Sequence, residues 1–455
     1  MDSLSAIYAD YICNSSYEKL PAQVISQAKH SILDLVGVSL AGFSLMEFPQ
    51  TVVNYVAGLG GKPEATILVK GSEKVPAISA ALANGACAHA LDMDDGHRYA
   101  GGHPGAAVIP AAIACAEMCG ASTRELINGI VAGYEVDIRI AMAINPSSLM
   151  RGFHITGVVG PFGAAAAAAS IMHLSTEETI GALGLAGMQG AGLLAVMHDD
   201  EAAKAKSLSP ARAAEAGLLA AVLAREGARG PAAILEGEDG FLKAMADKIN
   251  TEMLTRELGE TYEINNTYIK FHAACRHTHV SIDAVLAACQ REQIAPEDIS
   301  SIDIESYPVA LKLCSTVHPA TASAARFSIP FSVALALIKG DAGADKYSQG
   351  NIDDDRIQNL AGKIKLSISS KWEELYPGKR GATVSITDSQ GKTISTEMEL
   401  AIGEPETPAS PEDYSRKFYT NASVLVSDGK AKEIADAILD LENISLTEFT
   451  SSFEG

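Results

Sequence analysis

Residues 81–112 read ALANGACAHALDMDDGHRYAGGHPGAAVIPAA, and the organisation of the whole chain follows from this stretch. Ionisable side chains interrupt two apolar segments built of small residues, namely Asp92, Asp94, Asp95, His97 and His103. Charged groups inside apolar segments cost free energy, so proteins keep them there mainly where they bind or react. The stretch therefore predicts a chemical site.

The segments on both sides of these side chains have the pattern of buried helices. Pro76 stands in a first turn, apolar residues recur on one face through residue 91, and residues 108–118 form a second apolar run. The loop between them is rich in glycine, which lets a ligand approach the backbone closely. The helix that restarts after the loop has free N–H groups that suit an anion such as a carboxylate.

Three interpretations of this cluster are open. A metal site would use the acids and histidines as ligands, but their spacing matches no calcium loop, and the sequence has neither HExxH nor a paired Cys-x-x-Cys. A helix end with solvated acids, and a histidine that donates to a carbonyl group, explains any one residue taken alone. General acid/base chemistry, in which a carboxylate orients a histidine, best explains the residues together.

The same residues resemble a known family. The pattern NGxxxHxLDxDD, a short loop and HPG is followed by a second histidine before a Gly-rich helix, and then by a lysine at a helix start. Together these blocks resemble the MmgE/PrpD family, which includes 2-methylcitrate dehydratases, cis-aconitate decarboxylases and iminodisuccinate epimerases. The likeness covers nearly the whole chain, and it is carried by Asn84-Gly85, His89, Asp92, Asp94-Asp95, His103-Pro104, RGFHITGVVGPFGAAAAA around His154, Lys206, and IKFHAACRHTHVSIDA with Lys270 and His279.

The resemblance implies a set of active-site residues. Those expected to take part in catalysis are Asp92, His103, His154, Lys206, Lys270 and Cys275. Those expected to bind substrate are His279, which the resemblance marks, and His97, Arg276 and Arg326, which are chosen for their charge and position in the sequence. Solvated surface would explain about half of the charged groups in the inserted domain. Asp92 with His103 would transfer the proton, His154 would serve the opposite face, and the lysines would hold carboxylates and stabilise charge. Neither a metal nor a cofactor is expected, and a homodimer is implied.

Local sequence alone leaves several of these choices open. Lys206 precedes Ser209 and Pro210, a good N-cap and first-turn pair, so it stands beside the positive end of an expected helix. A solvated loop lysine explains Lys204 and Lys206 equally well. His154, which precedes an apolar helix, could be a structural histidine.

Length and charge narrow the class of protein. A chain of 455 residues with 47% hydrophobic and 5% aromatic content is expected to form two domains with cores of Ala, Leu, Ile and Val. The net charge of −21 repels nucleic acid and anionic membranes, so neither partner is expected. The expected ligand is a small di- or tricarboxylate, which local cations must hold against the overall field.

The cysteines and the N-terminus bear on location. The seven cysteines are an odd number and lie mostly in apolar helical patterns, which is typical of a reducing cytosol. The first residues, MDSLSAIYAD, lack a basic start and a continuous apolar run, so no signal peptide is expected. Apolar stretches such as 157–172 are rich in Gly and Ala, which favours buried helices over membrane spans. We expect a soluble, cytoplasmic protein.

The fold is expected to be mainly α, with two unlike domains. Residues 1–261 and 401–455 predict a large all-α domain, and residues 262–400, where β-type runs alternate with helices, predict a smaller inserted α/β lid domain. Capping boxes are predicted at Ser122 and Ser175, the second opening a helix through residue 197. A strand is predicted over 262–271 and a hairpin turn at 388–391. The site should lie in the cleft between the domains.

The expected reaction follows from what the resembled family's activities share, a carbanion formed or quenched beside a carboxylate. A hydro-lyase of the 2-methylcitrate dehydratase type is expected first, then an epimerase of an imino- or hydroxy-dicarboxylate, then a cis-aconitate decarboxylase. Decarboxylation ranks last because Cys275 stands where those decarboxylases carry a histidine. We expect Cys275 to be an inert buried thiol unless Lys270 or Arg276 lowers its pKa.

Two other classes of protein stay open. A metal-dependent hydratase or hydrolase would use Asp94, Asp95, His97 and His103 as ligands. A non-enzymatic helical interaction module would show no saturable binding of di- or tricarboxylates.

Overall fold

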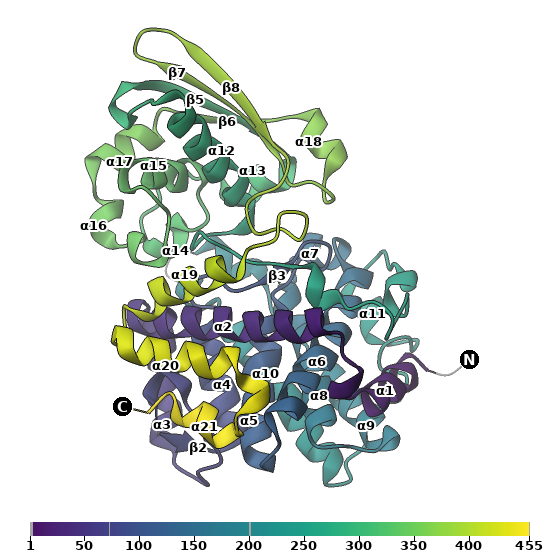
Figure 1. The fold of residues 1–455 in the computed structure, drawn as a ribbon. Coiled ribbons are helices and arrows are strands. Elements are labelled where there is room, and N and C mark those ends of the chain that lie inside the picture. Colours follow the sequence, from purple (N-terminus) through teal and green to yellow (C-terminus); the bar gives the residue numbers. More distant parts are fainter. Residues whose placement is uncertain (1–2, 72, 200–201, 455) are drawn as a thin grey trace.

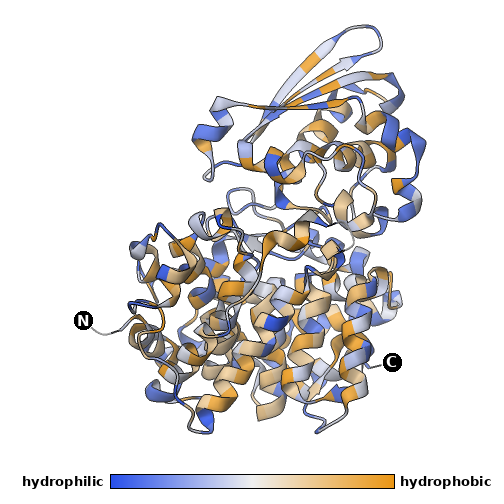
Figure 2. Ribbon diagram, turned by 180° about the vertical axis from the view of Figure 1, so that it is seen from behind, coloured by the Kyte–Doolittle hydropathy of each residue, from blue (hydrophilic) through white to orange (hydrophobic). Residues whose placement is uncertain are grey.

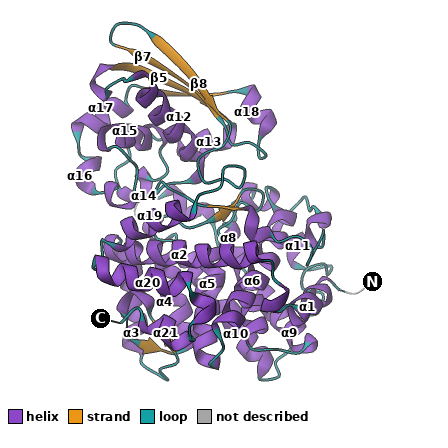
Figure 3. Ribbon diagram, viewed as in Figure 1, coloured by secondary structure: helices purple, strands orange, loops and turns teal. Residues whose placement is uncertain are grey.

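The computed structural model describes residues 3–71, 73–199 and 202–454. Helix accounts for 60% and strand for 9%, which confirms the mainly α fold with a smaller α/β portion. Figure 1 shows two bodies of unequal size, and Figure 3 shows that the longer strands gather in the smaller one. We call them the helical body (α1–α11 with α19–α21) and the α/β body (α12–α18 with β5–β8).

The helical body is formed by two separated parts of the chain. The first contains α1 (Leu4–Asn14), α2 (Ala22–Leu45), α3 (Glu47–Leu59), α4 (Ala77–Ala88), α5 (Pro104–Cys119), α6 (Thr123–Ile144), α7 (Ser147–Met150), α8 (Ile155–Ile171), α9 (Thr176–Gly187), α10 (Leu208–Arg225) and α11 (Phe241–Met245). The second contains α19 (Pro411–Ala422), α20 (Asp428–Leu439) and α21 (Leu446–Ser451). Both parts share one apolar core. The domain boundaries given above stay a prediction.

Small residues set the packing of the central helices. A side chain at Gly217 of α10 would lie 2.5 Å from Ala164 of α8, and one at Gly163 of α8 would lie 2.8 Å from Asp137 of α6. These distances are below van der Waals contact, so glycine is what lets the three helices approach so closely. Residues at the ends of these helices reach the predicted site, because Asn145 follows α6, His154 precedes α8 and Lys206 lies just before α10.

The α/β body is a four-stranded sheet with helices. Its strands β5 (Ile299–Ser306), β6 (Ile364–Ile368), β7 (Ala382–Asp388) and β8 (Thr393–Met398) run in the order β6-β5-β7-β8, with β5 and β6 parallel and the other pairs antiparallel. The predicted hairpin is confirmed, because Thr387 pairs with Thr393 across its turn. Its helices are α12 (Arg276–Glu292), α13 (Pro308–Cys314), α14 (Ala322–Ala325), α15 (Ile329–Lys339), α16 (Gln349–Ile352), α17 (Asp355–Ala361) and α18 (Ser370–Leu375).

Short strand pairs complete the fold. The first joins β1 (Ala65–Thr66) to β2 (Lys74–Val75). The second joins β3 (Gly96–His97), in the site loop, to β4 (Thr267–Tyr268), which leads into the α/β body. This second pair holds the site loop against the segment that leads to Lys270.

Three local predictions differ from the structure. The helix opened by Ser175 ends at Gly187, not at residue 197, because a side chain at Gly187 or Gly190 would collide with its neighbours and the chain there packs as irregular backbone. Helix α10 begins at Leu208, so Ser207 stands at its N-cap instead of Ser209. Only Thr267–Tyr268 of the strand predicted over 262–271 is extended, since residues 263–266 form a 3₁₀ turn.

Apolar residues run along the helices of both bodies in Figure 2, as expected for faces that pack together. Among the described residues no single helix has the length and apolar character needed to cross a membrane. The bent pair α2 and α3 meets the requirement of length and composition together, with 95° between the two helices.

Candidate active site

The site loop joins α4 to α5 and brings the predicted acids and histidines together. It begins at His89, the C-cap residue of α4, and ends at His103, the N-cap residue of α5. Asp92 has φ 51°, in the left-handed region that residues other than glycine rarely adopt. Unfavourable backbone of this kind is concentrated at functional sites.

Asp92 is the centre of the charged groups. Lys270 Nζ donates to Asp92 Oδ1 at 2.5 Å and to its carbonyl oxygen at 2.6 Å. Lys206 Nζ donates to Asp92 Oδ2 at 3.1 Å. Burial alone would raise the pKa of Asp92, but the ammonium groups of Lys206 and Lys270 hold it well below its usual range. Asp92 is therefore a carboxylate over the whole physiological pH range.

His103 is fixed in one tautomer by the backbone. Its Nδ1 lies 2.6 Å from the carbonyl oxygen of Asp95, so Nδ1 carries the proton and Nε2 keeps its lone pair. Nε2 lies 3.7 Å from Asp92 Oδ1. Burial lowers the pKa of His103 well below its usual value, although the charge of Asp94 opposes this shift. His103 is therefore a neutral imidazole at neutral pH, able to accept a proton.

His89 stands in the motif NGxxxHxLDxDD, although no role was predicted for it from the sequence. Its Nδ1 lies 2.9 Å from both carboxylate oxygens of Asp94, and its Nε2 accepts from Lys206 at 2.8 Å. Burial lowers its pKa well below the usual value, and Lys206 lowers it further. A neutral His89 thus links a buried acid to a catalytic candidate. The spacing of His89 from Asp94 could have drawn attention to the pair.

His154 and Cys275 each stand immediately before a helix. His154 is the N-cap residue of α8, and its ring centre lies 5.5 Å from that of His89. Burial lowers the pKa of His154 well below its usual value, and Lys206 lowers it further. The pKa of Cys275, the N-cap residue of α12, is lowered because the Cys314 thiol hydrogen-bonds to it, and Lys270 adds to this against the effect of burial. The main cause is therefore a neighbouring thiol rather than a cation.

These side chains surround a cavity of about 260 Å³. Of the predicted residues, the ones that line it are Asp92, His103, His154, Lys206, Lys270, Cys275 and Arg276. Lining residues come from the helical body and from the α/β body, so the structure brings all six catalytic candidates to one cavity at the junction of the two.

Two of the predicted binding histidines support the loops instead of lining the cavity. His97 Nδ1 accepts from the backbone N–H of Ala100 at 3.1 Å, and its Nε2 lies 3.5 Å from a carboxylate oxygen of Glu263. His279 Nε2 donates to the carbonyl oxygen of Ala274 at 3.1 Å. Both side chains are buried. Their role in substrate binding stays a prediction.

The two predicted binding arginines also have protein partners. Arg326 does not line the cavity, and its Nη1 donates to the carbonyl oxygens of Ala273, at 2.6 Å, and Leu91, at 3.3 Å. Arg276 lines the cavity, but its Nη2 and Nε donate to Glu404 Oε1 at 2.9 and 3.1 Å. Arg276 is thus neutralised by a carboxylate of its own chain.

Other cavity residues had no role in the sequence analysis. They come from the α/β body and its connection, and include Tyr268, His277, Lys312, Tyr376 and Arg380. Apart from His277, which lies near Lys270 in a block with several charged groups, no motif or spacing pointed to them. Their approach to the site depends on how the α/β body packs against the helical body.

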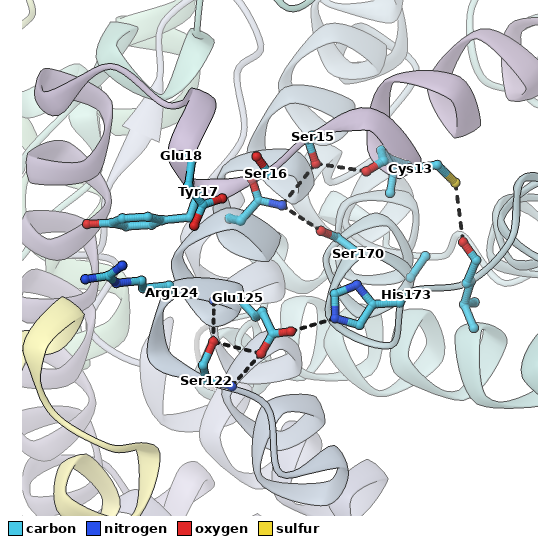
Figure 4. A pocket seen from close by; sticks show the side chains of 14 residues that line it. Cys13, Ser15, Ser16, Tyr17, Glu18, Ser122, Arg124, Glu125, Ser170 and His173 are labelled. Carbon is cyan, nitrogen blue, oxygen red and sulfur yellow. Dashed lines mark hydrogen bonds and ion pairs between the residues drawn. The ribbon is translucent and has the colours of Figure 1, made fainter.

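A larger cavity of about 430 Å³ lies at α1, α6 and α8 of the helical body. Figure 4 shows that Ser122, Glu125 and His173 turn toward one another there. Glu125 accepts from the hydroxyl group of Ser122 at 2.7 Å and lies 2.6 Å from Nε2 of His173. None of the predicted site residues lines this cavity. The smaller cavity is therefore the candidate active site.

Four of the site residues have the geometry for a metal ion. One ligand atom from each of His89, Asp92, Asp94 and His103 lies within 4.8 Å of the others. Two of these groups already accept from ammonium groups, since Asp92 is bonded to both lysines and His89 Nε2 to Lys206. A divalent cation would have to displace two positive charges from the same lone pairs.

Known proteins match this chain along most of its length. The family model described as the MmgE/PrpD N-terminal domain matches residues 7–253, and that of the MmgE/PrpD C-terminal domain matches residues 272–443.

Curated relatives at similar identity have two different activities in their names. The cis-aconitate decarboxylase of Aspergillus terreus is 26% identical over 95% of this chain and 92% of its own. The cis-aconitate decarboxylase of Homo sapiens is 25% identical over 98% and 93%. The 2-methylcitrate dehydratase of Salmonella typhimurium is 24% identical over 97% and 95%. Identities this close do not distinguish the two activities.

Proposed function

The chain belongs to the MmgE/PrpD family, and on that premise we propose that it is a cofactor-independent hydro-lyase acting on a small di- or tricarboxylate. The observation that carries the proposal is the arrangement at Asp92. A neutral His103 faces the cavity beside a carboxylate that two lysines hold ionised. This combination supports removal of a proton from a carbon next to a substrate carboxylate.

The lysines can bind substrate without leaving Asp92. An ammonium group has three N–H donors. Lys206 uses one for His89 and one for Asp92, and Lys270 uses one for each of two oxygens of Asp92. Each lysine therefore keeps one donor for a substrate carboxylate, and each positive charge stabilises the electron pair left on carbon when the proton departs.

Dehydration can be written with the residues present. His103 Nε2 takes the proton from the carbon beside the carboxylate, and the electron pair forms the new double bond. The bond from the neighbouring carbon to its hydroxyl group breaks, and the leaving hydroxide takes the proton that His103 has just accepted, which gives water and returns His103 to its neutral form. Burial lowers the pKa of His154 well below its usual value, so His154 is a neutral imidazole that can hydrogen-bond the leaving hydroxyl group through its one N–H.

The experiment is turnover in deuterated water followed by proton NMR. Citrate-type hydroxy acids, cis-aconitate and an imino-dicarboxylate are supplied separately, and double-bond signals, carbon dioxide and deuterium uptake are recorded together. Loss of water from a hydroxy acid supports the hydro-lyase, provided that His103→Ala abolishes it. Rapid carbon dioxide release from cis-aconitate, unchanged in Cys275→Ala, would overturn it in favour of a decarboxylase.

A second candidate is an epimerase, which the lowered pKa of Cys275 favours. An epimerase needs one group to remove a proton from one face of a carbon and another to return a proton to the opposite face. His103, as the base, and the thiol of Cys275, whose lowered pKa makes it a better acid, are two such groups in the one cavity. If the protein is an epimerase, Cys275→Ala would abolish inversion while deuterium exchange that depends on His103 continued. If it is a hydro-lyase, Cys275→Ala would leave the rate of dehydration unchanged.

We also infer a homodimer and a cytoplasmic location. The family resemblance implies the dimer, and light scattering at micromolar concentration tests it, because a monomer would refute it. The seven cysteines are all free, which agrees with a reducing compartment.

A further inference from the structure

Apart from Asp92 and the exposed Lys312, the charged groups that line the active-site cavity fall into two sets. Lys206 and Lys270 share Asp92, at the site loop. Arg276 and Arg380 approach from the α/β body, and Arg276 is paired with Glu404. Three of these four cations therefore have a carboxylate partner within the chain.

Arg380 is the exception. Its Nη2 donates to the carbonyl oxygen of Arg98 at 2.6 Å, and its Nε is buried without a hydrogen-bond partner. No carboxylate group lies within ion-pair distance of it in the described part of the chain. The side chain is only 7% exposed, yet it lines the cavity.

Arg380 has no direct ion pair, and the carboxylate of Glu404, whose charge acts on Arg380 from beyond ion-pair distance, is bonded to Arg276. Other buried cations, away from the cavity, are held by partners within the chain: Arg139 lies 3.0 Å from Glu135, Lys417 lies 2.5 Å from Asp34, and Arg326 donates to two carbonyl oxygens. A buried guanidinium without a direct ion pair costs free energy in general, and a ligand carboxylate that arrives at it removes most of this cost.

The backbone holds Arg380 in place. The next residue, Gly381, packs on the ring of buried Trp372 so closely that any side chain there would collide with it. The hydroxyl group of Ser306 donates to the carbonyl oxygen of Gly381 at 2.9 Å. The guanidinium is thus presented from a fixed strand start, and little conformational entropy would be lost when it binds an anion.

His277 adds a second polar group from the same body. It lines the cavity, and its Nδ1 lies 2.7 Å from the hydroxyl group of buried Tyr307, which leaves Nε2 for a ligand. Burial keeps this imidazole neutral, with its pKa lowered to about 3. Because His277 is neutral, it leaves the positive charge of Arg380 available to a ligand, whereas a carboxylate in its place would cancel that charge.

We propose that Arg380, with His277 beside it in the cavity lining, binds a second substrate carboxylate, away from the carboxylate held by Lys206 and Lys270. The proposal rests on the proposed function and deepens it, because it makes the distance between two carboxylates the feature by which substrates are selected. A monocarboxylic acid can occupy only the lysine end and is therefore a poor ligand.

The test compares two non-reacting probes that both carry a carboxylate at one end. Glutarate has a second carboxylate at its other end, and butyrate has none. Binding of each to the full-length protein is measured by titration calorimetry. We expect glutarate to bind more tightly than butyrate, and Arg380→Gln to weaken glutarate binding by about 10- to 100-fold while butyrate binding is unchanged. Arg380→Lys, which keeps the charge but loses the planar fork, should lie between the two.

The neighbouring lysine supplies a matched control. Lys379 pairs with Glu399 on the surface and does not line the cavity, so Lys379→Gln removes the same charge and should leave both affinities unchanged. Thermal unfolding without ligand shows whether each variant is folded. If Arg380→Gln does not fold, Arg380→Lys still tests the proposal.

The other possible outcomes refute either the second-carboxylate subsite alone or the proposed function together with it. If the wild-type protein binds and converts a dicarboxylate but Arg380→Gln and Arg380→Lys bind glutarate as the wild type does, only the second-carboxylate subsite is refuted. An equal loss for glutarate and butyrate also refutes it, since the arginine then acts on the cavity as a whole. If the wild-type protein binds neither glutarate nor any tricarboxylate, the proposed function fails as well.

Discussion

Lys206 Nζ lies 2.8 Å from Nε2 of His89, and the ammonium group can only be the donor in this contact. His89 must therefore keep its proton on Nδ1, which donates to Asp94. The order Asp94, His89, Lys206 aims the ammonium group at Asp92 and the cavity. The buried Asp94 thus fixes the position of the Lys206 ammonium group through His89.

We predict that His89→Gln lowers kcat/KM by about 10- to 100-fold, because the ammonium group of Lys206 loses one of its two fixed partners and shifts by a fraction of an ångström. Steady-state kinetics with the wild-type substrate measures this. His173→Gln is the control, since His173 is exposed and bonded to Glu125 away from the cavity. A His89→Gln enzyme with wild-type kinetics and unchanged thermal stability would show that Lys206 needs no such support.

The pH dependence of catalysis should follow His103. Its pKa is lowered well below 6.5 by burial, so the base stays unprotonated as the pH falls through 6.5. We predict that kcat/KM is level from pH 8 to pH 6 and declines only at lower pH. Lys270→Met should move the acid limb to higher pH, since Lys270 also lowers this pKa. An acid limb centred at 6.5 in the wild type would contradict the assignment of His103 as a buried base.

Local sequence was sufficient for features that depend on neighbouring residues. The capping boxes at Ser122 and Ser175 form as predicted, because the hydroxyl group and the glutamate three residues later meet within a single turn. The site loop was found for the same reason, since Asp92 and His103 lie in one short segment. The end of α9 was missed because the glycines there are set by packing against distant side chains.

Tertiary pairings lay beyond the reach of local patterns. Lys206 meets His89 across 117 positions, and Arg380 donates to Arg98 across 282. Family resemblance selected Lys206, but the resemblance supplied no reason to select Arg380. That Arg380 has no direct ion pair could be seen only when the partners of Lys206, Lys270 and Arg276 in the same cavity were known.

We predict that catalysis needs no divalent metal. Two of the four residues with metal-site geometry, His89 and Asp92, already accept from ammonium groups, so a cation would face strong repulsion there. Activity after dialysis against a chelator should equal that before it, and added Mg²⁺, Mn²⁺ or Zn²⁺ should not raise it. Activity lost to the chelator and restored by one ion would establish the metal-dependent alternative instead.

Asp137 should make the helical body less stable as the pH rises. It is buried in α6 against α8, its Oδ2 has no hydrogen-bond partner, and burial raises its pKa to about 8, from 3.8. The folded state therefore holds a proton that the unfolded state has released between about pH 4 and pH 8. The stabilisation that the neutral acid gives to the folded state is fully present below pH 4. As the pH rises, the free energy of unfolding falls by about 1.4 kcal/mol per pH unit for one such group.

Asp137→Asn keeps the shape of the side chain and removes the titration. We predict that the variant and the wild type differ least near pH 4, and that the advantage of the variant grows up to about pH 8 and then stays constant. Urea unfolding at pH 5, 6.5 and 8 measures it, with Asp303→Asn, on the exposed side of β5, as the control. A difference that is the same at all three pH values would mean that Asp137 is ionised in the folded protein, and would point to a cation or a water-filled space beside α6 that compensates its charge.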